Sequence, residues 1–331
     1  MPKAVPADDL VKIPSPHPGW RESYYFDFYD ERLGLGMWHS IGKKPLKGYS
    51  GFAMGVWGPD TLVGVGRDRF TKHTEEHIVE GLRYECLVPN EKWRLTFTGE
   101  LARPALQFRL DPAVFQPDGN KGLPRVPVSF DLVFTGTVPA YRYHERPEWN
   151  SLFTGHLDQT GHTTGTVTIA GKTYQVSGLG ARDRSWGTRD WNWPRRWRYV
   201  ELPSPGLNLM FWYAEGDGGV KIIDGFLDDG TECSTIVDYQ EELSVEPSSP
   251  KPIPKSFKIT VKAANNRVVT VSGEVLQIMP VVFSKEQDGK VVHSWNDRSM
   301  VRYRLPDGQT AYGEIEFAER VEEDRRSAGP K

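Results

Sequence analysis

Apolar and polar residues alternate along much of the chain, as they do in β-strands that bury one face. Two alternating runs flank the turn Ala-Gly-Lys and predict a hairpin at residues 164–178. In the first half the same pattern predicts strands within residues 23–30, 77–88, 92–101 and 126–138. No segment has convincing helical periodicity, and 33 Gly and 25 Pro punctuate the runs. We therefore predict an all-β protein of barrels or sandwiches.

The second half continues the alternation. We expect strands in the segments RYVEL, LNLMFWYAE, VKIIDGFLDDG, SFKITVKA, RVVTVSGEVLQI, SMVRYRL and TAYGEIEFAE. The stretch 139–155 is rich in Pro, Gly and aromatic residues and is typical of a long connection, so we place a domain boundary near residue 150. The expected division is an N-terminal tail at 1–18, β-domains at 19–150 and 151–320, and a C-terminal tail at 321–331. Both tails lack periodicity and are expected to be loose.

Composition narrows the range of partners. The formal net charge of −3 provides no general attraction for nucleic acid or an anionic membrane. Cys86 and Cys233 have no disulfide or zinc-binding spacing around them. The chain shows no apolar leader and no apolar run of the roughly 20 residues that a membrane span requires. We therefore expect a cytoplasmic protein whose partners are small molecules or proteins.

Charged and aromatic residues are concentrated in ARDRSWGTRDWNW, residues 181–193. If 182–186 is extended, the twofold period of a strand places Asp183 and Ser185 on one face. The opposite face then carries Arg182, Arg184 and Trp186. Gly187 permits a sharp bend, after which the chain can double back toward this cluster. The residues that would return are Arg189, Asp190 and Trp191.

The segment has two interpretations, which are compatible with each other. In the structural one, arginines stacked on tryptophan and neutralised by aspartate close the end of a β-barrel. In the functional one, a buried carboxylate and guanidinium lined by indole rings form an acid/base pair at the floor of an apolar cavity. Both interpretations remain open at this stage.

The same segment carries a family resemblance. GLGARDRSWGTRDW, with GHLDQTGHTTGTVTIAGKTYQVSG upstream, AYGEIEF downstream and ESYYFDF near the start, resembles the AttH-like, hydroxyneurosporene synthase (carotenoid hydratase) superfamily. The resemblance implies two lipocalin-like (calycin-type) antiparallel β-barrels in tandem. It also implies functions that range from isoprenoid hydratases and cyclases and polyketide pericyclases to lipid carriers. Hydratase-like relatives tend to have Asp-His-x-Trp, whereas this chain has Asp183-Arg184-Ser185-Trp186, and a guanidinium does not exchange its proton at neutral pH.

Our hypothesis is a cofactor-free enzyme that hydrates, dehydrates, isomerises or cyclises a hydrophobic unsaturated small molecule such as a terpenoid, polyketide, steroid or aromatic compound. Asp183 would be the acid/base, with His156 or Asp190 as its relay, because histidine titrates near working pH. The residues that would orient this carboxylate or bind a substrate oxygen are Arg182, Arg184 and Arg189. The residues that would shape the cavity are Trp186, Trp191, Tyr25, Trp38, His39, Trp212 and Tyr213. Alternation lets only half of the strand residues face inward.

Other functions have weaker support. A carrier that binds a lipid or isoprenoid without transforming it would use the same aromatic cavity. HTEEH at 73–77 matches a zinc-peptidase pattern, but in a strand the two histidines would lie about 13 Å apart, too far to share one ion. The chain has no nucleotide-binding loop and no nucleophile elbow around Ser185. We therefore expect neither a metal nor an organic cofactor, and we expect Glu201 to be a solvated carboxylate at a strand edge.

Overall fold

The computed structural model describes residues 2–59, 61–70, 76–105, 111–116, 118–287 and 289–324. Within these ranges the chain forms β-strands joined by turns and five short 3-10 helices, and it has no α-helix. The all-β prediction is therefore confirmed for the described residues. None of the helices in this part of the chain has the length and apolar character that a membrane crossing requires.

The first sheet is antiparallel and contains eleven strands in the order β4-β3-β2-β1-β11-β10-β8-β7-β6-β5, with β9 paired to β10. Its strands are β1 (Trp20–Asp30), β2 (Leu35–Lys44), β3 (Tyr49–Trp57), β4 (Leu62–Arg69), β5 (His77–Val79), β6 (Leu82–Val88), β7 (Lys92–Ala102), β8 (Arg125–Gly136), β9 (Tyr141–Arg142), β10 (Gly155–Ile169) and β11 (Lys172–Thr188). Val63 of β4 also pairs with Ala102 of β7. This pairing brings the two ends of the path from β4 to β7 together.

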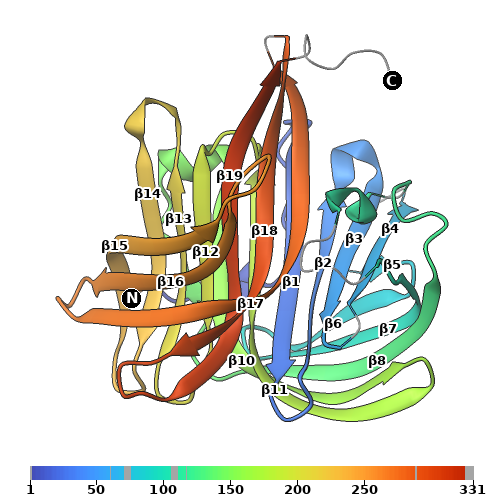
Figure 1. Cartoon of the computed structure of the whole chain (residues 1–331), viewed down its shortest axis with the longest axis horizontal. Helices are drawn as coiled ribbons and strands as arrows, with labels where there is room; N and C mark the ends of the chain where they lie inside the picture. Colours follow the sequence, from blue (N-terminus) through green and yellow to red (C-terminus); the bar gives the residue numbers. More distant parts are fainter. Residues whose placement is uncertain are drawn as a thin grey trace.

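The second unit is a closed antiparallel barrel in which each strand pairs with the next and β12 pairs with β19. Its strands are β12 (Arg196–Leu202), β13 (Asn208–Glu215), β14 (Lys221–Asp228), β15 (Cys233–Glu246), β16 (Ile253–Ala263), β17 (Val268–Gln287), β18 (Lys290–Arg304) and β19 (Thr310–Asp324). Figure 1 shows this barrel and the first sheet side by side, and β11 of the sheet contacts β12 and β19 of the barrel.

The strands expected from alternation are present, including the hairpin β10–β11, whose turn holds Ala170 and Gly171. The expected boundary near residue 150 is not where the chain changes sheets. β10 and β11 lie beyond that position and pair with β8 and β1 of the first sheet, so the change falls between Thr188 and Arg196. The Pro- and aromatic-rich stretch that predicted the boundary is a connection within the first sheet, because the chain returns to that sheet through β10.

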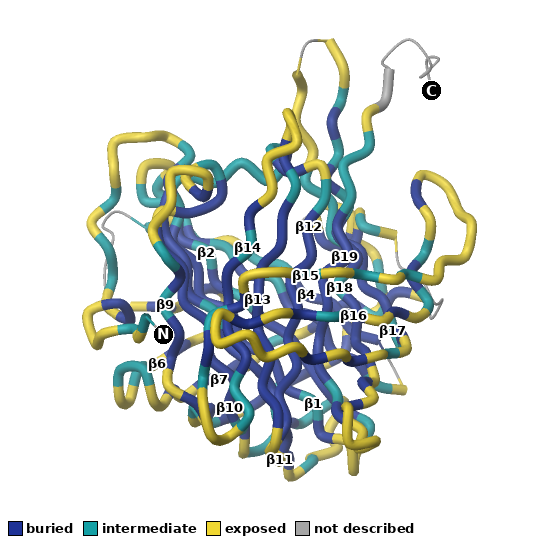
Figure 2. Tube along the Cα trace, turned by 90° about the vertical axis from the view of Figure 1, so that its left-hand side faces the viewer, coloured by how far each residue is buried: buried dark blue, intermediate teal, exposed yellow. Residues whose placement is uncertain are grey.

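Alternation divides each sheet between two cores. One face of the first sheet buries an apolar cluster that includes Phe26, and the barrel interior buries another that includes Phe211. Two further clusters lie where the units meet and draw residues from both, such as Tyr143 with Trp212 and Trp38 with Met279. Figure 2 shows the buried positions running through the centre of the molecule, with exposed positions at the turns and along β15 and β16.

The N-terminal segment is packed against the first sheet and is not the loose tail that we expected. Lys3 forms a β-bridge with Tyr141, and Asp9 is buried. The carboxylate of Asp9 accepts a hydrogen bond from Arg182 at 2.8 Å, which holds the segment over the sheet. At the other end of the chain β19 continues to Asp324, and 325–331 lie outside the described residues.

Candidate active site

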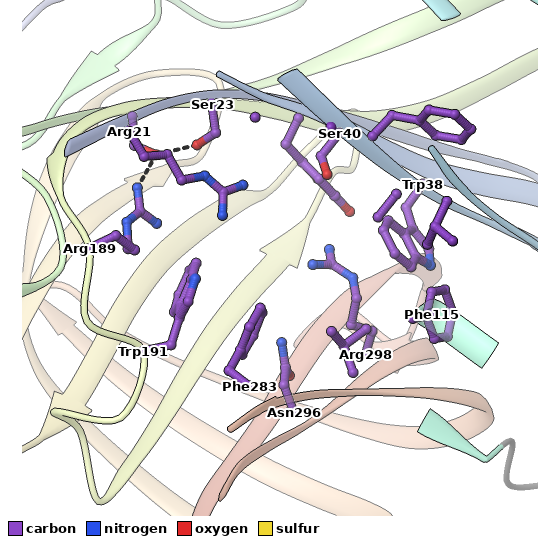
Figure 3. Close-up of a pocket in the computed structure, with 18 of the residues that line it drawn as sticks. Arg21, Ser23, Trp38, Ser40, Phe115, Arg189, Trp191, Phe283, Asn296 and Arg298 are labelled. Carbon is purple, nitrogen blue, oxygen red and sulfur yellow. Dashed lines mark hydrogen bonds between the residues drawn. The ribbon is translucent and has the colours of Figure 1, made fainter. Parts of the chain in front are cut away.

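A cavity of about 270 Å³ lies between the two units. Its walls come from strands β1, β2, β3, β4, β10 and β11 of the first sheet and from β12, β13, β17, β18 and β19 of the barrel, with the 3-10 helix Pro112–Phe115 beside them. Figure 3 shows charged and aromatic side chains pointing into this space from both sides. The candidate site therefore lies outside the barrel interior, at the contact between the two units.

The alternation predicted for β11 is confirmed. Asp183 and Ser185 line the cavity. Their strand is held between β1 and β10, where Asp183 lies opposite Tyr25 on one side and Asp158 on the other. The central position of β11 in the sheet therefore carries the carboxylate to the contact with the barrel.

The opposite face of β11 has a structural role, which corrects the catalytic and binding roles expected for Arg182, Arg184 and Trp186. Arg182 pairs with Asp9, and Arg184 pairs with Glu22 and donates to the hydroxyl of Tyr24 at 2.8 Å. The cationic groups that lie over the ring of Trp186 belong to Lys12, Arg142 and Arg184. Because these side chains point away from the cavity, they close the end of the first sheet under the N-terminal segment.

Gly187 lies within β11, opposite Arg21 of β1, so the strand continues past the position where the sequence predicted a sharp bend, and the turn falls at residues 191–192. The glycine has φ +127°, and a Cβ there would lie 2.3 Å from the backbone nitrogen of Thr154. Beyond β11, Arg189 and Trp191 line the cavity. Asp190 does not, because its carboxylate pairs with Lys285 at 2.8 Å away from the lining. The relay role expected for Asp190 is therefore corrected.

A hydrogen-bonded group on β10 lies beside Asp183. His156 lines the cavity, and its Nε2 lies 2.7 Å from Oδ1 of the fully buried Asp158. Asp158 also accepts hydrogen bonds from the hydroxyls of Tyr143 at 2.6 Å and Tyr199 at 2.8 Å. Since a carboxylate only accepts, Nε2 of His156 carries a proton and Nδ1 is the other functional atom. Nδ1 is buried and has no hydrogen-bond partner among the described residues.

Burial sets the charge state of Asp183. Removal from water raises the pKa of this carboxyl to about 6, and Asp158 acts in the same direction. Positive charge on Arg189, and on His156 when its ring is protonated, opposes the rise because it favours the carboxylate. No described residue donates a hydrogen bond to the side chain of Asp183. A carboxyl group with this pKa can both give and take a proton near neutral pH.

The aromatic candidates divide according to strand face. Tyr25, Trp38 and Trp212 line the cavity. Their neighbours His39 and Tyr213 do not, which corrects the roles expected for them. His39 is buried in the core of the first sheet against Tyr84, where burial lowers its pKa to about 3. Tyr213 packs in the barrel interior against Tyr239.

Several cavity residues were missed from the sequence. They include Arg21, Tyr199, Phe283, Asn296, Arg298 and Glu316. Arg21 had a signal that could have found it, since it shares the face of β1 with Ser23 and Tyr25. Arg298 had none, because β18 meets the site only through the contact between the two units. Glu201 is buried rather than solvated, and burial with nearby Asp27 raises its pKa well above the ordinary value.

The first three residues of the zinc-peptidase pattern, 73–75, lie outside the described residues. Its last residue, His77, lies in β5 and packs against the rings of Tyr24 and Trp93. It is therefore part of the first sheet and far from an open metal-binding surface.

Solved structures share this fold over nearly the whole chain. The AttH candidate NE1406 from Nitrosomonas europaea has 11% identity and a TM-score of 0.58, with 94% of this chain and 98% of that chain covered. CghA, solved with Sch210972, has 10% identity and a TM-score of 0.57, with 98% and 95% covered. Kievitone hydratase from Nectria haematococca has 12% identity and a TM-score of 0.53, with 96% of both chains covered.

These likenesses show that the chain shares its fold with the AttH candidate, CghA and kievitone hydratase. A search of the curated proteins finds no significant match. A family model described as a domain of unknown function, DUF7064, matches residues 5–321. Because that match spans nearly the whole sequence, the chain belongs to the DUF7064 family.

Proposed function

We propose that the protein is an acid/base enzyme that needs no cofactor and acts on a hydrophobic unsaturated small molecule. The reaction class is hydration, dehydration, isomerisation or cyclisation of a terpenoid, polyketide, steroid or aromatic compound. The observation that carries the proposal is Asp183, a carboxyl group in the cavity between the two units that has no hydrogen-bond donor among the described residues and a pKa raised by burial to about 6. Carboxyl groups in such surroundings are typical general acids and bases.

His156 supplies the second proton-transfer group. The carboxylate of Asp158 accepts a hydrogen bond from Nε2 of His156 and fixes the ring. This leaves Nδ1 to accept a proton. In a hydration, protonated Asp183 would give its proton to the unsaturated carbon or to an oxygen of the substrate. His156 would then take a proton from the attacking water, and transfer between the two groups would restore the starting state. Dehydration would use these steps in reverse.

The walls suit a substrate that develops positive charge. Trp191 stacks on Phe283 with ring centroids 4.9 Å apart and on Trp212 with ring centroids 6.1 Å apart, and all three side chains line the cavity. The faces of such rings attract cations, and the surrounding apolar surface excludes water. CghA and kievitone hydratase, which share the fold, are compatible with chemistry of this kind.

We also propose that the two units are lipocalin-like barrels in tandem. The closed path β12–β19 and the pairing of β4 with β7 support this arrangement. The cavity between the units would then be shared by both barrels, because each contributes one wall.

The experiment that tests the function starts from native mass spectrometry of the freshly purified protein, followed by organic extraction of any bound compound. The extract is incubated with wild type, with Asp183→Asn and with the control Asp131→Asn, whose carboxylate pairs with Arg94 on the exposed surface. We expect wild type and the control to change the mass by one water or to isomerise the compound, while Asp183→Asn leaves it unchanged. Recovery of an unchanged compound from all three would favour a carrier and contradict the proposal.

A further inference from the structure

Two arginines face the same part of the cavity. Arg21 comes from the start of β1 and Arg189 from the segment after β11, and both line the cavity. Figure 3 shows both guanidinium groups directed into this space near Ser23. The position of Arg189 is set by two contacts. Its Nη2 donates to the hydroxyl of Ser185 at 2.7 Å, and its guanidinium lies 4.6 Å from the ring centroid of Trp191.

The two guanidinium groups lack the partners that other enclosed arginines have. Arg182, Arg184, Arg198 and Arg298 each form an ion pair with a carboxylate. Among the described residues, no carboxylate pairs with Arg21 or Arg189 in this way, and the Nε of each is buried without a hydrogen-bond partner. Two unpaired cations in an enclosed site are unfavourable because neither is solvated as it would be in water.

The charge of Arg21 also acts on Arg189. Burial and the neighbouring charge of Arg21 lower the pKa of Arg189 to about 9, and burial also lowers the pKa of Arg21. Asp183 attracts both groups, and Glu316 also attracts Arg189 but is itself paired with Arg298, so protonation of Asp183 leaves neither arginine with a carboxylate of its own. An anion between them would remove this deficit.

A glycine of the first sheet leaves space for the guanidinium group of Arg21. A Cβ on Gly42 of β2 would lie 2.8 Å from Nη2 of Arg21 and 3.1 Å from its Cζ, so the guanidinium occupies the place of a side chain. Lys44, two residues further along the same face, and Tyr49 line the cavity beside it. The positive charge therefore gathers at one part of the cavity, while the aromatic wall of Trp191 and Phe283 continues from it.

We propose that Arg21 and Arg189 form an anion subsite that binds a carboxylate, or an equivalent planar oxyanion, on an otherwise apolar substrate. The inference rests on the proposed function, because it specifies the substrate class of the same cavity. The anionic group would lie between the two guanidinium groups. The apolar part would lie along Trp191 and Phe283, which places the reacting portion of the molecule near Asp183 and His156.

Calorimetric titration with 2-naphthoate and with 2-naphthamide tests the subsite. The two probes have nearly the same shape, and only the first is an anion at pH 7. We expect the acid to bind wild type more tightly by about tenfold to a hundredfold, as hydrogen bonds to charged groups allow. Equal affinity for the two probes, or no binding of either, overturns the proposal without reference to any variant.

Substitutions of the two arginines test whether they cause the preference for the acid over the amide. In Arg21→Gln and in Arg189→Gln the ratio of acid to amide affinity should fall toward one, while amide affinity stays nearly constant. The matched control is Arg302→Gln, which removes an exposed arginine paired with Glu274 at 2.6 Å and should keep the full ratio. A ratio that survives both cavity substitutions overturns the assignment to these residues. Thermal unfolding checks that each variant is folded.

This experiment is independent of turnover. A carrier without catalytic activity would still prefer the acid, whereas the enzyme proposal fails only when Asp183→Asn and wild type treat the extracted compound alike. Failure of the anion subsite and failure of the proposed function are therefore separate results.

Discussion

At the scale of single residues, neighbouring side chains of β11 have different surroundings because they lie on opposite faces of the sheet. Asp183 faces the cavity, whereas Arg184 faces the opposite side and pairs with Glu22 under the N-terminal segment. The strand at 182–186 therefore has a structural face that packs under the N-terminal segment and an opposite face that carries the carboxyl group we propose as the acid/base. An aspartate that burial keeps partly protonated is costly for stability, because folding must oppose its ionisation.

We predict that Asp183→Asn is at least as stable as wild type at pH 7. Since the folded pKa lies above the unfolded value of 3.8, ionisation of Asp183 weakens the fold as pH rises from about 4 to 6, and the loss stays constant above that range. Removing the ionisable group should raise the free energy of unfolding by about 1–3 kcal/mol at pH 7. Urea unfolding at pH 7 and below pH 3.8 measures this, and the difference should vanish at the lower pH. A less stable variant at pH 7 would contradict the assigned environment.

We predict that Asp158→Asn disables His156 without emptying the cavity. The neutral amide of asparagine accepts a hydrogen bond from Nε2 more weakly than the carboxylate does, so it no longer fixes the ring tautomer that leaves Nδ1 free to accept a proton. The turnover number should fall by about a hundredfold or more, with a smaller change in KM. Histidine ¹⁵N chemical shifts report the tautomer directly. Tyr199→Phe is the control, because it removes one hydrogen bond to Asp158 and keeps the carboxylate.

At the scale of elements, the long hairpin β10–β11 joins the cavity to the rest of the first sheet. β11 pairs along its length with β10 and at its end with β1, so His156, Asp183 and Tyr25 hold fixed relative positions. Near the end of β11, Gly187 has a positive φ and approaches Thr154 so closely that a side chain is excluded. This contact holds the end of the strand that precedes Arg189 and Trp191.

We predict that Gly187→Ala is much more harmful than Gly171→Ala. Both glycines have positive φ, but a Cβ on Gly171, in the hairpin turn, would meet no atom within 4 Å, whereas a Cβ on Gly187 would meet Thr154 at 2.3 Å. Gly171→Ala should cost about 1 kcal/mol of unfolding free energy and Gly187→Ala about 3 kcal/mol or more. Chemical denaturation measures both. Similar losses of unfolding free energy in the two variants would show that Thr154 does not constrain the backbone at Gly187.

At the scale of the whole molecule, the site exists only because two units meet. The first sheet brings Asp183 and His156, and the barrel brings Tyr199, Trp212 and Arg298. Buried hydrogen bonds cross the contact, such as Tyr199 to Asp158 at 2.8 Å and Tyr141 to Asp224 at 2.6 Å. Neither unit can expose its face of this contact without leaving buried polar groups unpaired.

We predict that the two units unfold together in one thermal transition. Separate unfolding of either unit would expose the shared apolar clusters and break the hydrogen bonds of Asp158 and Asp224. Scanning calorimetry should give equal calorimetric and van't Hoff enthalpies, and tryptophan fluorescence should change at the same temperature as the far-ultraviolet signal. Two resolved transitions would show that the contact contributes little to stability.

The sequence by itself determined the local features. Alternation predicted most strands, the hairpin at 164–178, and the division of Asp183 from Arg182 and Arg184, because a strand turns successive side chains to opposite faces. These features depend on neighbours in the chain, so they can be read without knowing the rest of the fold.

Only the tertiary structure decided which faces meet. Period-two alternation places Trp38 and His39 on opposite faces of one strand, and Trp212 and Tyr213 on opposite faces of another. It does not say which of these faces meets the other unit. It also does not place Arg298 in the same cavity as Asp183, since β18 and β11 lie more than a hundred residues apart in the chain. The cavity is set by long-range packing between a sheet and a barrel, and its chemistry emerges when both are in place.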